Sequence, residues 1–225
     1  MSGLIRLGDL GGAGAAYREI KRRIIELIYE PGEKLSEARL SAELGLGRSP
    51  IRTALARLEG EGWIIVSPQS GTYVRGLSTK EIDDVLEIRL VLETYVAGVA
   101  SQRIEQSELA ELRAAFQAFG PTVGSERINE YFDLDLRVHL AIYKAAGNAL
   151  ITQNLVDLID KVRWIRRGST GWPPRIQEAY EEVERILAAL ERRDPEAARH
   201  AMHAHISNII SFRKESPRTA RAAKA

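Results

Sequence analysis

The protein has 225 residues, of which 44% are hydrophobic, and a formal net charge of +1 at pH 7. This allows one large domain or two small ones with a buried core. The absence of cysteine excludes a disulfide framework and a thiolate zinc site. The apolar runs are too short to cross a bilayer, and the N-terminus lacks the apolar core of a signal peptide. We therefore expect a soluble cytoplasmic protein with no membrane partner.

The N-terminal third begins with an arm and a helix. Residues 1–14 are small and Gly-rich, and we expect them to form a flexible arm ahead of a domain over 15–76. Helical periodicity indicates a first helix from Tyr17 to Tyr29. The dipeptide Pro31-Gly32 would end it, because neither residue continues a helix well.

Capping signals mark two further helices. Ser36 is a typical N-cap for a second helix that Gly45 would stop. Ser49 followed by Pro50 predicts the start of a third helix, with serine as the cap and proline at the first helical position. Its apolar spacing continues to about Glu59.

Two β-prone runs follow the third helix. WIIVS and GTYVR are joined by the turn-rich segment Pro68-Gln69-Ser70-Gly71, which favours a small hairpin. Three helices, a Gly-containing turn and a hairpin in this order predict a winged helix-turn-helix, which is a DNA-binding fold.

The residues expected to meet DNA lie at the start of the third helix and in the wing. A recognition helix presents its N-terminal residues to base edges, here Arg48, Ser49 and Arg52. Arginine binds guanine or phosphate, and serine bonds to either. In the wing, Gln69 and Gly71 would let backbone N–H groups approach phosphate. For one arginine alone a solvated helix face is the better explanation, but the ordered set of elements favours DNA binding.

The string LGLGRSPIRTALARLEGEGWI, followed by SGTYV, resembles the DNA-binding domain of the GntR family of bacterial repressors. The resemblance covers roughly residues 15–76. It implies DNA contacts by Arg48, Ser49, Arg52 and Gly71, with Arg39 of the second helix as a weaker phosphate contact.

After Gly76 the sequence indicates long amphipathic helices and no convincing strand, so the fold class is mainly α, with a helical bundle of about six helices over 77–213. Residues 1–76 hold 11 Lys and Arg against 9 Asp and Glu, whereas 77–213 hold 17 against 21. The tail, 214–225, is polar and basic, and we expect it to be disordered. The expected bundle helices span 79–103, 107–119, 125–146, 148–168, 173–193 and 195–213.

Asp135 and His139 stand four residues apart on a mostly apolar helix face, so both point to the bundle interior. His205 lies in the last helix. One carboxylate and two imidazoles that converge in a bundle can hold a divalent metal ion. A core histidine hydrogen-bonded to Asp135 is the simpler explanation from spacing alone.

Residues 79–213 also resemble the ligand-binding FCD domain of the FadR branch of GntR regulators, on the strings EIRLVLETYVAGVAS, DLRVHLAIYKAAGN and LERRDPEAARHAMHAHI. In metal-binding members one Asp and three His surround a divalent ion such as Zn, Ni or Mn. Asp135, His139 and His205 match three positions, but the fourth falls on Val183, which cannot ligate a metal.

Three outcomes are compatible with Val183. In the first, the three remaining side chains hold a metal ion whose open positions take water or the effector. In the second, Glu182 or Glu184 reaches the site, although helical phase argues against both. In the third, the site holds no metal and binds the effector directly.

Arg89, paired with Glu93 at i, i+4, is the second polar feature of the bundle. The resemblance implies that an arginine here faces the effector, and it could hold a carboxylate bidentately. A surface ion pair is equally compatible with the sequence. The expected effector-binding residues are Arg89, Asp135, His139 and His205.

These patterns predict a transcriptional regulator, expected to be a repressor, and not an enzyme. A homodimer would bind double-stranded operator DNA with inverted-repeat half-sites, under the control of a small organic-acid effector. The alternative is a helical metalloenzyme with an Asp/His/His centre fused to a DNA-binding head. Against it, the sequence offers no further acid or base at convincing spacing.

Overall fold

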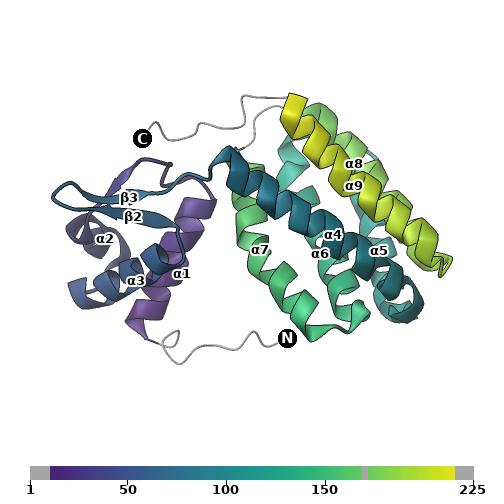
Figure 1. Cartoon of the computed structure of the whole chain (residues 1–225), viewed down its shortest axis with the longest axis horizontal. Coiled ribbons are helices and arrows are strands. Elements are labelled where there is room, and N and C mark those ends of the chain that lie inside the picture. Colours follow the sequence, from purple (N-terminus) through teal and green to yellow (C-terminus); the bar gives the residue numbers. More distant parts are fainter. Residues whose placement is uncertain (1–10, 169–171, 216–225) are drawn as a thin grey trace. The chain divides into compact units, whose positions relative to one another are not determined.

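The computed structural model describes residues 11–168 and 172–215 (Figure 1). Within this part, the chain divides into two compact units: one holds the residues up to Thr79 together with Arg163–Gly168, and the other holds Lys80–Val162 and residues 172–215. We call the first unit the head and the second the bundle. Within the described residues, no helix has the length and apolar character needed to cross a membrane.

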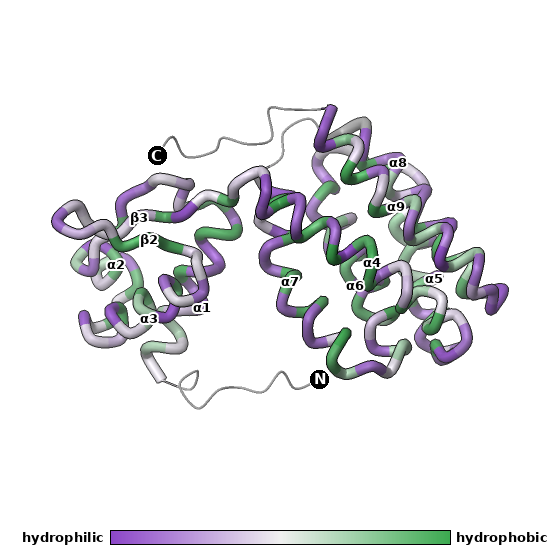
Figure 2. The backbone as a smooth tube through the Cα atoms, viewed as in Figure 1, coloured by the Kyte–Doolittle hydropathy of each residue, from purple (hydrophilic) through white to green (hydrophobic). Residues whose placement is uncertain are grey.

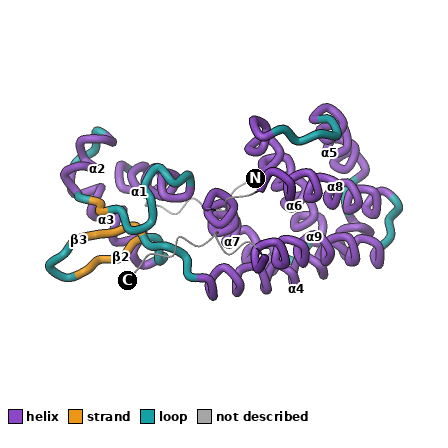
Figure 3. Tube along the Cα trace, turned by 90° about the horizontal axis from the view of Figure 1, so that it is seen from above, coloured by secondary structure: helices purple, strands orange, loops and turns teal. Residues whose placement is uncertain are grey.

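The head is a winged helix-turn-helix, as predicted. Its strands, orange in Figure 3, form a small sheet. The sheet is antiparallel in the order β1-β3-β2, with Ile65 opposite Tyr73 and Lys34 opposite the same residue on the other side. The two-residue strand β1 was not predicted, because so short a run has no periodicity. The elements are α1 (Gly12–Ile25), β1 (Lys34–Leu35), α2 (Glu37–Leu44), α3 (Arg48–Gly60), β2 (Ile64–Ser67) and β3 (Gly71–Val74).

The head core forms where one face of each helix meets the sheet. Ile20 and Ile24 of α1 and Ile51 of α3 are fully buried, and Trp63 and Val74 close the core from the sheet side. Apolar residues at spacings of three and four supply this face on both helices. Packing of α1 on α3 therefore fixes the direction in which α3 presents its opposite, polar face.

The predicted bounds of α1 were wrong at both ends. The helix begins at Gly12, inside the segment expected to be an arm, and it ends at Ile25 rather than at Tyr29. Leu27 takes a left-handed conformation (φ 57°), and the N–H of Ile28 returns to the carbonyl of Arg23. This turn folds Tyr29 back into the core, where it is 1% exposed. Burial of the aromatic ring thus outweighs continuation of the helix. Residues 1–10 lie outside the described part.

The capping predictions held for α2 and failed for α3. Ser36 caps α2 by accepting a hydrogen bond from the N–H of Arg39, and Gly45 ends it in the left-handed conformation. The helix α3 instead begins at Arg48 with Gly47 at the N-cap, so Ser49 is not a cap. Pro50 fits because the first N–H groups of a helix have no intrahelical acceptor.

The bundle is all-helical in its described residues, as predicted, and its tube alternates between hydrophilic and hydrophobic along the helices (Figure 2). Asp194 caps the last helix by accepting from the N–H groups of Glu196 and Ala197. That helix extends two residues into the segment expected to be a disordered tail, whose residues 216–225 are not described. The elements are α4 (Thr79–Arg103), α5 (Gln106–Phe119), the 3-10 turn η2 (Ser125–Arg127), α6 (Ile128–Ala146), α7 (Ala149–Gly168), α8 (Trp172–Glu191) and α9 (Pro195–Glu215).

Candidate functional site

The N-terminal turn of α3 presents the residues expected to read DNA. Arg48 and Ser49 are exposed, and Arg52 follows one turn later with its side chain 72% exposed. The opposite side of the helix is anchored in the core by Ile51 and Leu55. The three polar side chains therefore share a solvent-facing surface on a rigid element.

Arg52 is held by an acidic partner from the neighbouring helix. Its Nε and Nη2 donate to the two carboxylate oxygens of Glu37, each at 3.0 Å. Arg52 lowers the pKa of the Glu37 carboxyl, so the pair is ionised at neutral pH. The bidentate pair uses one edge of the guanidinium and leaves Nη1 pointing elsewhere.

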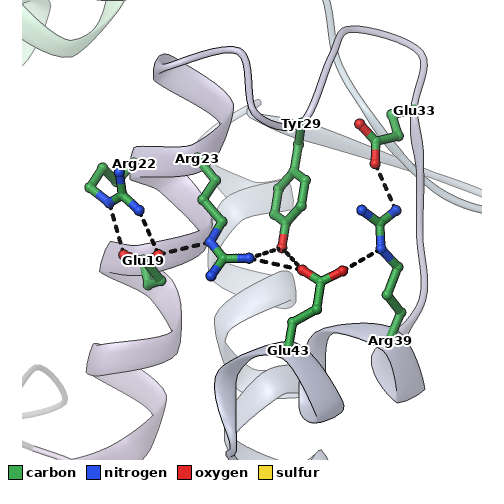
Figure 4. Close-up of polar contacts among 7 residues, drawn as sticks. All are labelled: Glu19, Arg22, Arg23, Tyr29, Glu33, Arg39 and Glu43. Carbon is green, nitrogen blue, oxygen red and sulfur yellow. Dashed lines mark hydrogen bonds and ion pairs between the residues drawn. The ribbon is translucent and has the colours of Figure 1, made fainter.

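Arg39 belongs to an ionic cluster that joins α1, α2 and the loop before β1 (Figure 4). Its Nε donates to Glu43 at 2.6 Å and its Nη1 to Glu33 at 2.7 Å. Glu43 also accepts from the hydroxyl of Tyr29 at 2.5 Å and from Arg23 at 2.9 Å. Two carboxylates thus neutralise the charge of Arg39, so Arg39 would attract a phosphate less strongly than an unpaired arginine would. We call this set the head cluster: Glu19, Arg22, Arg23, Tyr29, Glu33, Arg39 and Glu43.

The wing is the predicted hairpin, and two residues of its turn have positive φ angles. Gln69 is exposed and left-handed (φ 63°), and Gly71 has φ 127°, where a side chain would be strained. A Cβ on Gly71 would lie 2.7 Å from Cε of Lys34. Lys34, which the sequence analysis did not single out, thus places a cation beside the wing.

In the bundle, the structure brings together Asp135, His139 and His205. Asp135 and His139 lie on α6 and His205 on α9, and all three side chains are at most 3% exposed. Oδ1 of Asp135 is 3.5 Å from Nε2 of His139 and 3.8 Å from Nε2 of His205. One ligand atom from each residue lies within 4.8 Å of the others.

His139 is held from behind by two residues of α4. Its Nδ1 lies 2.5 Å from Oε2 of Glu93, and Oε1 of Glu93 accepts from Nε of Arg89, also at 2.5 Å. Both α4 side chains are buried, so the surface ion pair that the sequence left open is not observed. We call Arg89, Glu93 and His139 the Arg89 triad.

His205 has an equivalent support on α8. Its Nδ1 is 2.8 Å from Oε2 of Glu182, and the same oxygen accepts from Nη2 of Arg175 at 2.6 Å. Oε1 of Glu182 accepts from Asn208 at 2.6 Å. We call Arg175, Glu182 and His205 the Arg175 triad, and both triads with Asp135 the buried cluster.

Helical phase did not predict that Glu182 is buried, but Glu182 contacts Nδ1 of His205 and is not among the three grouped ligands, whereas Glu184 pairs with Arg113. Val183 and Glu182 are both buried because α8 packs against α5, α6 and α9, which together cover a wide face of it. A long side chain at the margin of that face reaches inward. Arg175, seven residues before Glu182, falls on the same side of the helix, and this spacing could have revealed the pair.

The electrostatics of the two histidines differ. Burial lowers the pKa of His139, but the charges of Glu93 and Asp135 outweigh it and raise the pKa to about 9. For His205 burial prevails over Glu182, and the pKa lies below its usual value. A proton on His139 therefore balances the carboxylates of the metal-free cluster, and a metal ion would have to displace it.

The residues present fit a divalent metal ion. Nε2 of His139 and Nε2 of His205 are buried and have no hydrogen-bond partner among the residues that the structure describes. Ligand atoms at about 2.0–2.1 Å from a tetrahedral zinc ion are roughly 3.4 Å apart. The distances of 3.5 and 3.8 Å from Asp135 require only a small contraction to reach this value, and the whole set, whose ligand atoms lie within 4.8 Å of one another, must close around the ion.

Comparison with known proteins gives two family matches. Residues 13–74 match the family described as "Bacterial regulatory proteins, gntR family", and residues 84–208 match the FCD domain. The two matches fall on the head and on the bundle, respectively.

Individual relatives match over most of their length. The chain is 28% identical over 196 residues to the HTH-type transcriptional repressor RspR of Escherichia coli (strain K12), covering 86% of this chain and 85% of that protein. It is 27% identical over 201 residues to the gluconate operon transcriptional repressor of Bacillus licheniformis, covering 85% and 80%.

Solved structures support the fold. E. coli McbR/YncC matches with a TM-score of 0.68 at 21% identity, over 91% of this chain and 98% of that chain. A GntR transcriptional regulator from Rhodococcus sp. RHA1 matches with a TM-score of 0.72 at 18% identity, with the same coverage. At these identities the likeness concerns the fold alone.

Proposed function

The chain belongs to the gntR family of bacterial regulatory proteins and carries an FCD domain, so it is a transcriptional regulator. From this premise we propose that it is a repressor that acts in the cytoplasm. Its affinity for the operator is set by an anionic effector, which binds in the bundle with the help of a metal ion. The observation that carries the proposal is the buried cluster. Ionisable groups in such number are costly in a core unless they serve a site.

We assign DNA reading to the exposed N-terminal turn of α3. Arg48, Ser49 and Arg52 contact base edges or phosphates, and the backbone at Gln69 and Gly71 approaches phosphate from the wing. Arg39 contributes least, because Glu33 and Glu43 already neutralise its charge.

Selection of binding sites from random DNA with the purified protein, followed by Arg52→Ala, tests this assignment. We expect an inverted repeat, and a loss of about 1–3 kcal/mol on the selected site if Arg52 reads a base. An equal loss on random DNA would mark Arg52 as a phosphate contact. Full retention of affinity by Arg52→Ala would remove this residue from the interface.

The charges of the buried cluster favour an anionic effector. With both imidazoles neutral, as metal ligation requires, two arginines, two glutamates and Asp135 leave one net negative charge. A divalent ion (Zn, Ni or Mn) reverses the sign to positive. The ion and its protein ligands Asp135, His139 and His205 would then hold a small carboxylate. Arg89 lies near this site because Glu93 links it to His139.

The helix α4 provides a route from this site to the head. It begins at Thr79, where the N-terminal segment of the head ends, and carries Arg89 and Glu93 into the buried cluster. A ligand that favours one position of α4 shifts DNA affinity by its differential affinity for the two arrangements.

A homodimer is supported by an exposed apolar stripe on α4. Ile88, Val91 and Tyr95 are 40%, 67% and 53% exposed, and their spacing of three and four places them on one helix face. A self-complementary face suits two-fold symmetry, which inverted half-sites about 34–36 Å apart require. Sedimentation of Val91→Glu should show a shift toward monomer, and an unchanged dimer would place the interface elsewhere.

The metalloenzyme alternative receives no support. The family matches cover both units with regulatory domains, and the polar groups around the three ligands are engaged in ion pairs rather than available as an acid or base.

A further inference from the structure

The replacement of one expected ligand by Val183 raises the question of what holds the remaining imidazoles in a ligating orientation. Both His139 and His205 direct Nδ1 away from Asp135 and Nε2 toward it. A neutral imidazole that donates Nδ1–H to a carboxylate presents a lone pair at Nε2, and the carboxylate also makes that nitrogen more basic.

Resting on the proposed metal site, we infer that Glu93 and Glu182 are a matched pair of positioning residues, each locked by its own arginine, that fix both imidazoles with Nε2 open toward the ion. Glu182 thereby supports the centre from outside the ligand sphere and does not replace the ligand missing at Val183.

The contacts of Glu182 distinguish these two roles. Its Oε2 accepts from Arg175 and His205, and its Oε1 accepts from Asn208. Both oxygens are therefore occupied, and binding an ion directly would break bonds to a buried arginine. In Glu93, Oε1 accepts from Arg89, and Oε2 lies 2.5 Å from Nδ1 of His139 as a close ion-pair contact rather than a well-aligned hydrogen bond.

The two triads come from different helices, which makes the repetition informative. Arg89 and Glu93 lie four residues apart on α4, whereas Arg175 and Glu182 lie seven apart on α8. Each arginine is at most 4% exposed. In each triad the arginine holds its glutamate at hydrogen-bond distance, 2.5 Å from Arg89 Nε and 2.6 Å from Arg175 Nη2.

Titration of the metal-free full-length protein with Co²⁺, followed by its visible absorption, tests the inference. Glu93→Gln and Glu182→Gln should each weaken Co²⁺ binding by about 10–100-fold, the usual effect of losing such a partner. The control Glu184→Gln, on the same helix but paired with Arg113, should stay within about two-fold of wild type.

Nitrogen-15 NMR of the histidine rings separates positioning from folding. In the wild type, both His139 and His205 should be Nδ1–H tautomers once the ion is bound. The double variant Arg175→Met with Glu182→Gln leaves no unpaired charge, so it should fold but still bind Co²⁺ weakly. Wild-type Co²⁺ affinity in Glu182→Gln would overturn the inference alone. Absence of Co²⁺, Ni²⁺, Zn²⁺ and Mn²⁺ binding by the wild type would overturn the metal site and the inference together.

Discussion

The head cluster and the buried cluster are built from the same side chains, arginines paired with glutamates, but differ in their access to water. In the head cluster Arg39 and Glu43 are 43% and 31% exposed, whereas in the buried cluster Arg89 and Glu93 are 4% and 0% exposed. Exposed pairs contribute little because water solvates the separated ions almost as well. Buried pairs have no such alternative.

The difference indicates what each set of charges does. The head cluster connects α1 to α2 through the hydroxyl of Tyr29, which contacts Arg23 and Glu43. Its charges therefore serve to fix the position of these two helices within the head. The buried cluster displaces apolar residues from the centre of a bundle, and that substitution costs stability unless a ligand or a defined state is gained. Burial, more than the number of ion pairs, therefore marks the site.

The largest expected effect comes from breaking the buried pair. Arg89→Met should lower the free energy of unfolding by roughly 3–5 kcal/mol, because Glu93 is left as a buried charge with reduced compensation. Urea unfolding followed by circular dichroism measures this loss. Arg89→Met combined with Glu93→Gln should recover part of it; if the double variant is no more stable than the single one, uncompensated charge is not the cause.

A smaller effect is expected for the matched change in the head. Arg39→Met removes contacts to Glu33 and Glu43 but leaves both carboxylates in contact with water, so the loss should be at most about 1 kcal/mol. The same unfolding experiment applies. A loss equal to that of Arg89→Met would show that the head cluster is as essential to folding as the buried one.

Salt sharpens the comparison with the smallest expected change. The Debye length is about 3 Å at 1 M ionic strength, and exposed pairs are screened much more than buried pairs. The difference in unfolding free energy between wild type and Arg39→Met should shrink in 1 M NaCl, while that for Arg89→Met persists. Equal shrinkage in both would contradict the assigned difference in solvent access.

Sequence patterns predicted the helices, the wing strands β2 and β3 and the three candidate ligands, because periodicity and i, i+4 spacing are local, but they missed the two-residue strand β1. They placed α1 wrongly, since the turn at Leu27 depends on burial of Tyr29 against another element. They also missed the role of Glu182, which depends on how widely neighbouring helices cover α8. Contacts across the fold, such as Glu182 to His205, lie beyond any single helical pattern.

The central claim is that the buried cluster controls the head. The most direct test is the dissociation constant of the selected operator, measured by fluorescence anisotropy with metal-free protein and with Zn²⁺ plus each of a series of small carboxylates. At least one combination of Zn²⁺ and carboxylate should change the dissociation constant of the wild type by about 5–150-fold. The same combination should leave the dissociation constant of the Asp135→Ala variant unchanged. The same constant for wild type and Asp135→Ala under every combination would contradict the claim.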